Sequence, residues 1–167
     1  MKSKQRSTNT TNSMAANKLK SNAKTWVCFL AYLLLLMYLV FISSGLGRVE
    51  HDEYRYNLTL FHEIGRYYNI GIQTGNWTLF RFNVIGNIVV FVPLGIFLPK
   101  LFLRCRKLLA VLVISLEVSL AVELVQLLTK VGSFDVDDLL LNTVGGVLGY
   151  LIYMTVSGAR RLFGKGR

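Results

Sequence analysis

The chain has 167 residues, enough for one domain; 53% of them are hydrophobic and only 17% are charged. Soluble domains of this size rarely have so apolar a composition. The net charge of +10 does not indicate nucleic-acid binding, because the basic residues are grouped beside apolar runs. Membrane proteins keep their cytoplasmic positive charge in such places. The composition therefore favours an integral membrane protein over a soluble one and argues against a nucleic-acid partner.

The first part of the chain consists of a polar tail followed by an uncharged apolar run. Residues 1–24 are rich in Ser, Asn, Thr and Lys and predict a disordered basic tail, since this composition cannot bury a core. Residues 26–42 carry no charge and predict a first transmembrane helix over about 26–43. A cleaved secretory signal is the alternative, but its apolar core is usually about 7–15 residues long.

A polar connection follows over residues 44–81. Within it, residues 58–68 place apolar side chains at spacings close to a helical turn, which predicts a short amphipathic helix at the external membrane surface. Three further apolar runs predict spans over about 82–99, 108–128 and 139–157, before a basic tail at 158–167. The expected fold is all-α: a multi-pass membrane domain over residues 25–157 with four transmembrane helices.

The distribution of Lys and Arg predicts the orientation of these helices. Six lie before residue 25, four lie in residues 100–107, and four lie from residue 160 onward, with no acidic residue among them. The other two connections hold five basic and seven acidic residues. Because positive charge is retained on the cytoplasmic side, both termini are predicted to be cytoplasmic in a cell-membrane protein.

Three of the predicted helices carry polar side chains near the same, external end. An ionisable group inside a span costs about 2.5–3.5 kcal/mol on the insertion scale, so it must face the bundle interior or serve a function. Spacings of three and four residues put these side chains on one face of each helix. The predicted polar face of the 108–128 helix also includes Ser119. The residues predicted to bind a ligand are Asn83, Asn87, Glu123, Gln126, Asp135, Asp138 and Asn142.

Each of these residues has a structural alternative. Asp135 is equally well explained as the cap of the last helix, and Asp137 and Asp138 as acidic groups at its positive end. Asn83 is a second candidate cap, and hydrogen bonding between helices accounts for Glu123 with Gln126. Clustering at one depth on three helices favours a site.

Other side chains are set apart from this cluster. Glu117 points about 240° away from Glu123 around the helix, near mid-membrane, where burial favours the protonated acid. The histidines, His51 and His62, lack metal-ligand spacing, and no phosphate loop or nucleophile elbow is present, so no metal or cofactor is predicted. The carboxylate and amide oxygens suit a hard cation or the hydroxyl and amide groups of a glycan or peptide. Cys28 and Cys105 are predicted to be free thiols.

Small residues and a proline give the predicted bundle its packing features. Gly145, Gly146 and Gly149 form a small face on the last helix that permits close approach of another helix. Pro93 lies inside the second span, two residues before Gly95, and predicts a kink.

The same positions carry a family resemblance. Four stretches match in order and spacing: residues 57–61 (NLTLF), 83–95 (NVIGNIVVFVPLG), 123–126 (ELVQ) and 132–149 (GSFDVDDLLLNTVGGVLG). On these stretches the chain resembles the VanZ-like family, named for an accessory protein of glycopeptide-antibiotic resistance. The family positions carried over are Asn87, Phe91, Pro93, Gly95, Glu123, Gln126, Asp135, Asp138, Asn142, Gly145 and Gly149. Two departures stand out: Leu60 lies where the family usually has Pro, and either Lys130 or no residue takes the place of an Arg that is frequent just before the Asp motif.

The resemblance implies a cell-membrane protein associated with low-level resistance to lipidated glycopeptides such as teicoplanin. Our leading hypothesis is a non-enzymatic protein that binds membrane lipids, a lipid-linked cell-wall precursor or the drug at the outer leaflet. One alternative is a small membrane enzyme with Glu123 or Asp138 as general base and a divalent cation. Another is a proton-coupled carrier that uses Glu117 and Glu123 within a homo-oligomer. The last is an assembly partner that associates through the glycine face.

Overall fold

A computed structural model describes residues 23–39, 54–130 and 132–163. Most of the predicted basic tail, residues 40–43 of the first predicted span, and residues 164–167 lie outside the described residues. The elements that follow the first helix, Ala23–Leu39, are β1 (Tyr56–Asn57), α2 (His62–Thr74), α3 (Thr78–Phe80), η1 (Arg81–Ile85), α4 (Gly86–Leu101), η2 (Leu103–Cys105), α5 (Leu108–Leu128), β2 (Phe134–Asp135) and α6 (Val136–Phe163). The described chain is thus almost entirely helical, as predicted.

Three helical segments are long and apolar enough to cross a membrane: Thr78–Leu101, Leu108–Leu128 and Val136–Ala159. The chain is therefore a membrane protein. The first and last of these segments begin earlier than predicted, because the helix continues through charged residues that the sequence reading placed in the connections. The helix Ala23–Leu39 is apolar but shorter, so the fourth span remains a prediction.

The most extensive contact between helices is that of α4 with α6, and glycines form it. A Cβ atom on Gly149 would lie 2.0 Å from the carbonyl oxygen of Val92, and one on Gly145 would lie 2.2 Å from that of Ile88. A Cβ on Gly95 would meet the Gly146 carbonyl oxygen at 1.9 Å. The predicted small face is therefore filled by α4 of the same chain, which removes the basis for an assembly partner at this face.

The first helix packs against this pair on its apolar side. Phe29, Tyr32 and Leu36 are buried in one core cluster with residues of α4 such as Leu94. The Tyr32 hydroxyl donates a hydrogen bond to the Val90 carbonyl oxygen at 3.0 Å. The Val90 carbonyl lies three residues before Pro93, and α4 continues through this proline as one helix.

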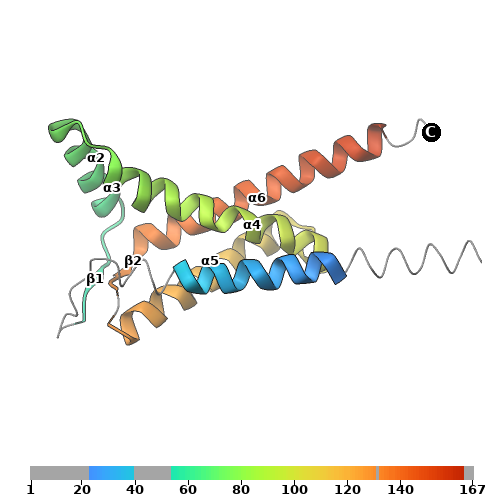
Figure 1. The fold of residues 1–167 in the computed structure, drawn as a ribbon, viewed down its shortest axis with the longest axis horizontal. Coiled ribbons are helices and arrows are strands. Elements are labelled where there is room, and N and C mark those ends of the chain that lie inside the picture. The colour runs from blue at the N-terminus through green and yellow to red at the C-terminus, as the bar shows by residue number, and fades with distance from the viewer. Residues whose placement is uncertain (1–22, 40–53, 131, 164–167) are drawn as a thin grey trace, which may run out of the picture.

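The two ends of the bundle differ in what they contain (Figure 1). At one end lie the start of the first helix, the connection between α4 and α5, and the end of α6. At the other end lie α2, α3 and the short strands, next to the starts of α4 and α6. The strands pair in parallel, with Tyr56 opposite Phe134 and Asn57 opposite Asp135. We call this second end the strand end.

Candidate functional site

Helix α2 is fixed to the bundle by a carboxylate from another helix. Asp137, in the first turn of α6, is 1% exposed. One of its oxygens accepts the backbone N–H of Phe61 at 2.5 Å, and the other accepts those of Glu63 at 2.9 Å and Ile64 at 3.2 Å. The first N–H groups of a helix have no partner within the helix. Asp137 thus caps α2, and it holds Phe61 in a left-handed conformation (φ 63°) that a bulky residue rarely adopts.

The strand pair is fixed by three polar side chains. Asn57 donates its side-chain amide to Asp135 at 3.1 Å and accepts the N–H of Thr59 at 3.0 Å. Glu123, near the end of α5 and 2% exposed, accepts the backbone N–H of Asp135 at 2.9 Å. Segments near residues 57, 123 and 135 therefore meet at one point, although they are far apart in the sequence.

A cavity of about 230 Å³ lies between the helices just inside the strand end. We call it the helix cavity. Six polar residues from α4 with η1, α5 and α6 line it: Asn83, Asn87, Glu123, Gln126, Asp138 and Asn142. The remaining lining is mainly apolar, including Leu36 and Leu39 of the first helix and Val122 of α5. The structure thus brings six of the seven predicted binding residues to one cavity; their role in binding remains a prediction.

Hydrogen bonds hold several of these side chains in place. Asn87 donates to the Asp138 carboxylate at 2.5 Å, which joins α4 to α6. Asn142 donates to the buried Ser119 hydroxyl at 2.9 Å, which joins α6 to α5. Asn83 donates to the Leu79 carbonyl at 2.8 Å, one turn back in its own helix. Since the helical segment begins at Thr78, Asn83 lies inside it, and its interpretation as a helix cap is wrong.

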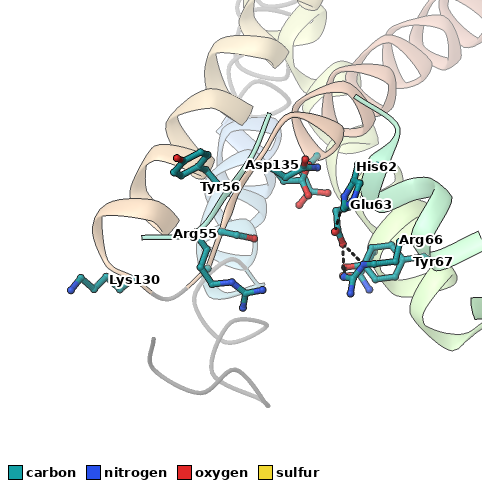
Figure 2. Close-up of a pocket in the computed structure, with 13 residues that line it drawn as sticks. Arg55, Tyr56, His62, Glu63, Arg66, Tyr67, Lys130 and Asp135 are labelled. Carbon is teal, nitrogen blue, oxygen red and sulfur yellow. Dashed lines mark hydrogen bonds and ion pairs between the residues drawn. The ribbon is translucent and has the colours of Figure 1, made fainter. Parts of the chain in front are cut away.

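A second cavity, of about 350 Å³, opens beside the first at the strand end (Figure 2). We call it the loop cavity. It is lined by the strands, by one face of α2 and by residues before α6, and it shares Asn83 and Asp138 with the helix cavity. Arg55 and Lys130 lie on one side of it in Figure 2, with Glu63, Arg66 and Tyr67 on the other.

The charges around the loop cavity are largely compensated. The Arg66 guanidinium pairs with the Glu63 carboxylate, with its Nε at 2.9 Å. His62 Nδ1 lies 3.3 Å from the other Glu63 oxygen. Burial raises the pKa of the Asp135 carboxyl, while hydrogen bonds from the Asp137 N–H and the Asn57 amide lower it less. Burial also raises the pKa of the Tyr67 phenol.

Asp135 caps α6, and it also lines a cavity. Its carboxylate accepts the N–H of Asp137 at 2.8 Å, so it caps α6, and it also lines the loop cavity. Lys130 lines the same cavity, with its ammonium group 5.2 Å from the centre of the Tyr54 ring. Glu117 is exposed on α5 and lines neither cavity.

The chemistry that this arrangement favours is hydrogen bonding. Within the described part of the chain, no group of three or more His, Cys, Asp or Glu side chains is placed to hold a metal ion. Amides and carboxylates can instead accept and donate hydrogen bonds to hydroxyl, amide or phosphate groups of a ligand. The prediction that Cys28 and Cys105 are free thiols is confirmed, and burial raises the pKa of Cys105.

Two residues of this region were missed as site residues from the sequence. Asp137 looked like one more acid at a helix start, and nothing local indicates that it caps a helix 76 residues earlier. Asn57 belongs to the NLTLF stretch that carries the family resemblance, and that stretch was the available signal. Its partner Asp135 lies in another matching stretch, so these motifs meet in space.

Comparison with known proteins identifies the family of this chain. A family model described as VanZ/LLP1 matches residues 29–157. Protein VanZ of Enterococcus faecium is 32% identical over 125 residues, which cover 73% of this chain and 68% of that protein. No solved structure matches. The matched region contains the residues that line both cavities, and the chain belongs to the VanZ/LLP1 family.

Proposed function

We propose that this protein gives its cell low-level tolerance to lipidated glycopeptides such as teicoplanin. It would do so without catalysis, by binding an outer-leaflet lipid, a lipid-linked cell-wall precursor or the drug at the helix cavity. The observation that carries this proposal is that six polar side chains from three helices line one cavity. Polar groups inside spans are costly unless they are used, so their convergence favours a binding site over scattered interhelical hydrogen bonds.

The proposal includes a topology of four spans, with both termini in the cytoplasm and α2 outside. The charge distribution supports it, because the basic connection at residues 100–107 lies at the bundle end opposite the strand end. The test uses single cysteines at Asn69 or Lys107 in a chain with Cys28→Ser and Cys105→Ser. We expect an impermeant maleimide to label Asn69→Cys in intact cells and Lys107→Cys only after permeabilisation; the reverse result would invert the topology.

Drug susceptibility tests the function itself. A deletion strain would be complemented with the wild type or with Glu123→Gln/Asp138→Asn, after matching the membrane levels of the two proteins. Both substitutions keep the side-chain volume and a hydrogen-bonding group while removing charge. We expect only the wild type to restore tolerance to teicoplanin, with vancomycin as the comparison drug. If both proteins restored tolerance equally, the two carboxylates would have only structural roles. If neither restored tolerance, the resistance role would be rejected.

Two alternative functions are those of an enzyme and of a carrier. An enzyme would use Glu123 or Asp138 as general base, and its activity would depend on metal or pH. A carrier would need Glu117 to act with Glu123. Glu117 is exposed on α5, and this position does not support its action together with Glu123.

A further inference from the structure

Helix α2 has an apolar face that the rest of the described chain does not cover. Tyr68 and Ile72 lie four residues apart on this face and are 49% and 61% exposed. Gly65 lies on the same face, and no atom of a neighbouring element comes within 4 Å of the position that its Cβ would take. Phe61, the residue just before the helix, is 60% exposed. Packing within the described chain therefore does not account for these apolar side chains.

The next face of α2 around the helix is polar. Four exposed residues recur on it at spacings of four and three: His62, Arg66, Asn69 and Gln73. Glu63 and Tyr67 follow on the side that lines the loop cavity (Figure 2). A helix with separate apolar and polar faces, both of them exposed, is typical of helices that lie in the plane of a membrane surface.

Aromatic contacts hold α2 against the next element of the chain. The Tyr68 ring lies edge-on to the rings of Trp77 and Phe80, with centroid distances of 5.6 and 6.3 Å. Gly71 allows this approach, because a Cβ there would lie 2.7 Å from a carbon of the Trp77 ring. The apolar face of α2 thus has one of its members, Tyr68, in direct contact with the residues that begin α3.

These contacts join α2 to the start of a membrane-spanning segment, Thr78–Leu101. Phe80 lies in the first turn of this segment, and its neighbours Leu79 and Phe82 are exposed apolar side chains that would contact lipid. Trp and Tyr are enriched where membrane proteins pass through the headgroup layer, as Trp77 and Tyr68 would do here. The apolar face of α2 therefore continues a lipid-facing surface at the depth at which the span begins (Figure 1).

We propose that α2 lies in the lipid headgroup layer, with Phe61, Tyr68 and Ile72 toward the acyl chains and Asn69 and Gln73 toward water. The loop cavity, which lies on the polar side of α2, then opens at the depth of the headgroups. The leaflet that α2 occupies follows from the proposed topology, whereas its contact with lipid does not depend on that topology.

Spin-label accessibility in phosphatidylcholine vesicles tests the orientation of α2. In the full chain with Cys28→Ser and Cys105→Ser, a nitroxide is attached at Ile72→Cys or, on the polar face of the same helix, at Asn69→Cys. Oxygen concentrates in the lipid, and a nickel complex remains in the water. We expect the ratio of oxygen to nickel accessibility to be several-fold higher for the label at position 72 than for the label at position 69.

Two results of this experiment would contradict the proposal. High and equal accessibility to the nickel complex at both positions would place the whole of α2 in water. Low accessibility to both reagents at position 72, together with disulfide-linked dimers of unlabelled Ile72→Cys, would show that a second copy of the chain covers the apolar face.

A charged substitution separates lipid contact from a structural role. Ile72→Asp places a carboxylate on the apolar face, and Gln73→Asp places the same group on the polar face of the same turn. We expect hydrogen exchange of the α2 amides in vesicles to become several-fold faster in Ile72→Asp and to stay unchanged in Gln73→Asp, because only the first brings a charge to the acyl chains. Since Ile72 is exposed, packing within the protein predicts no difference. Equal exchange in the two variants would overturn the lipid contact.

The inference and the proposed function fail separately. An inverted topology would move α2 to the opposite leaflet without changing the two accessibilities. If the labels place α2 in water while Glu123→Gln/Asp138→Asn still abolishes tolerance, the membrane-surface position is wrong and the resistance role remains.

Discussion

The α4–α6 contact and the strand end hold the molecule together in opposite ways. In the contact, Gly95, Gly145 and Gly149 let two backbones approach without any side chain between them. At the strand end, buried carboxylates join separate segments through hydrogen bonds, as Asp137 and Glu123 illustrate. Packing of small residues is how membrane helices associate, while buried polar groups are costly. The comparison separates a close glycine contact, which stabilises the bundle, from a polar end for which we propose a binding function.

The largest expected effect is on the glycine contact. Gly149→Leu would place a side chain where its Cβ alone lies 2.0 Å from the Val92 carbonyl oxygen. We expect a loss of about 3 kcal/mol in the free energy of unfolding. Thermal unfolding of the purified protein in detergent measures it, with Gly158→Leu as the matched control in open space. Equal stability of the two variants would show that the close helix approach is not required.

The next effect is local to α2. Asp137→Ala leaves three backbone N–H groups of Phe61, Glu63 and Ile64 without their acceptor. We expect about 2 kcal/mol of local destabilisation, which corresponds to roughly 30-fold faster hydrogen exchange at these amides. Asp137→Asn keeps one carbonyl oxygen, so its exchange rates should lie between those of Asp137→Ala and the wild type. Unchanged exchange in Asp137→Ala would mean that α2 does not depend on this cap.

A smaller effect is expected for the hydrogen bond between α5 and α6. A double-mutant cycle with Ser119→Ala and Asn142→Ala isolates the bond of 2.9 Å between them. Polar contacts between membrane helices contribute about 0.6 kcal/mol on average, so we expect a coupling energy of that size. A coupling energy comparable to the loss in Gly149→Leu would contradict the division between a stabilising contact and a functional end.

The smallest effect concerns pH. Burial raises the pKa of Asp135 above its ordinary value of 3.8 in the folded protein. The stability that this group contributes is therefore fully present below that ordinary value and is lost as the pH rises through the raised pKa. Asp135→Asn removes the titration, so its stability relative to the wild type should increase over this interval. Chemical unfolding at pH values from 4 to 7 measures this difference, and a difference that falls with rising pH would contradict the raised pKa.

Much of this architecture follows from the sequence, because apolar runs, charge and small residues act locally. The run at residues 108–128 coincides with α5, and the Gly145–Gly149 spacing identifies a close helix contact. The partner of the glycines was not predictable, since any helix could have occupied the face. Span boundaries near Arg81 were misplaced because a membrane helix accepts charged residues in its first turns.

Only part of the candidate site could be predicted from the sequence, because local patterns do not determine long-range contacts. Helical periodicity predicts which side chains share a face, so the polar residues of three helices could be grouped from the sequence alone. Periodicity says nothing about how a connection returns to the bundle. The parallel pairing of Asn57 with Asp135, and with it the loop cavity, depends on contacts 78 residues apart.

Crosslinking in native membranes tests most directly the claim that distant segments meet at the strand end. In a chain lacking its two native cysteines, Asn57→Cys and Asp135→Cys occupy paired positions of the strands. Paired strand positions fall within the Cα separation that a disulfide allows. Mild oxidation should link them and shift the electrophoretic mobility of the intact protein, while Asn57→Cys with Thr155→Cys, some 30 Å farther along α6, should remain reduced. Equal crosslinking of both pairs, or of neither, would contradict the account of one site assembled from separate motifs.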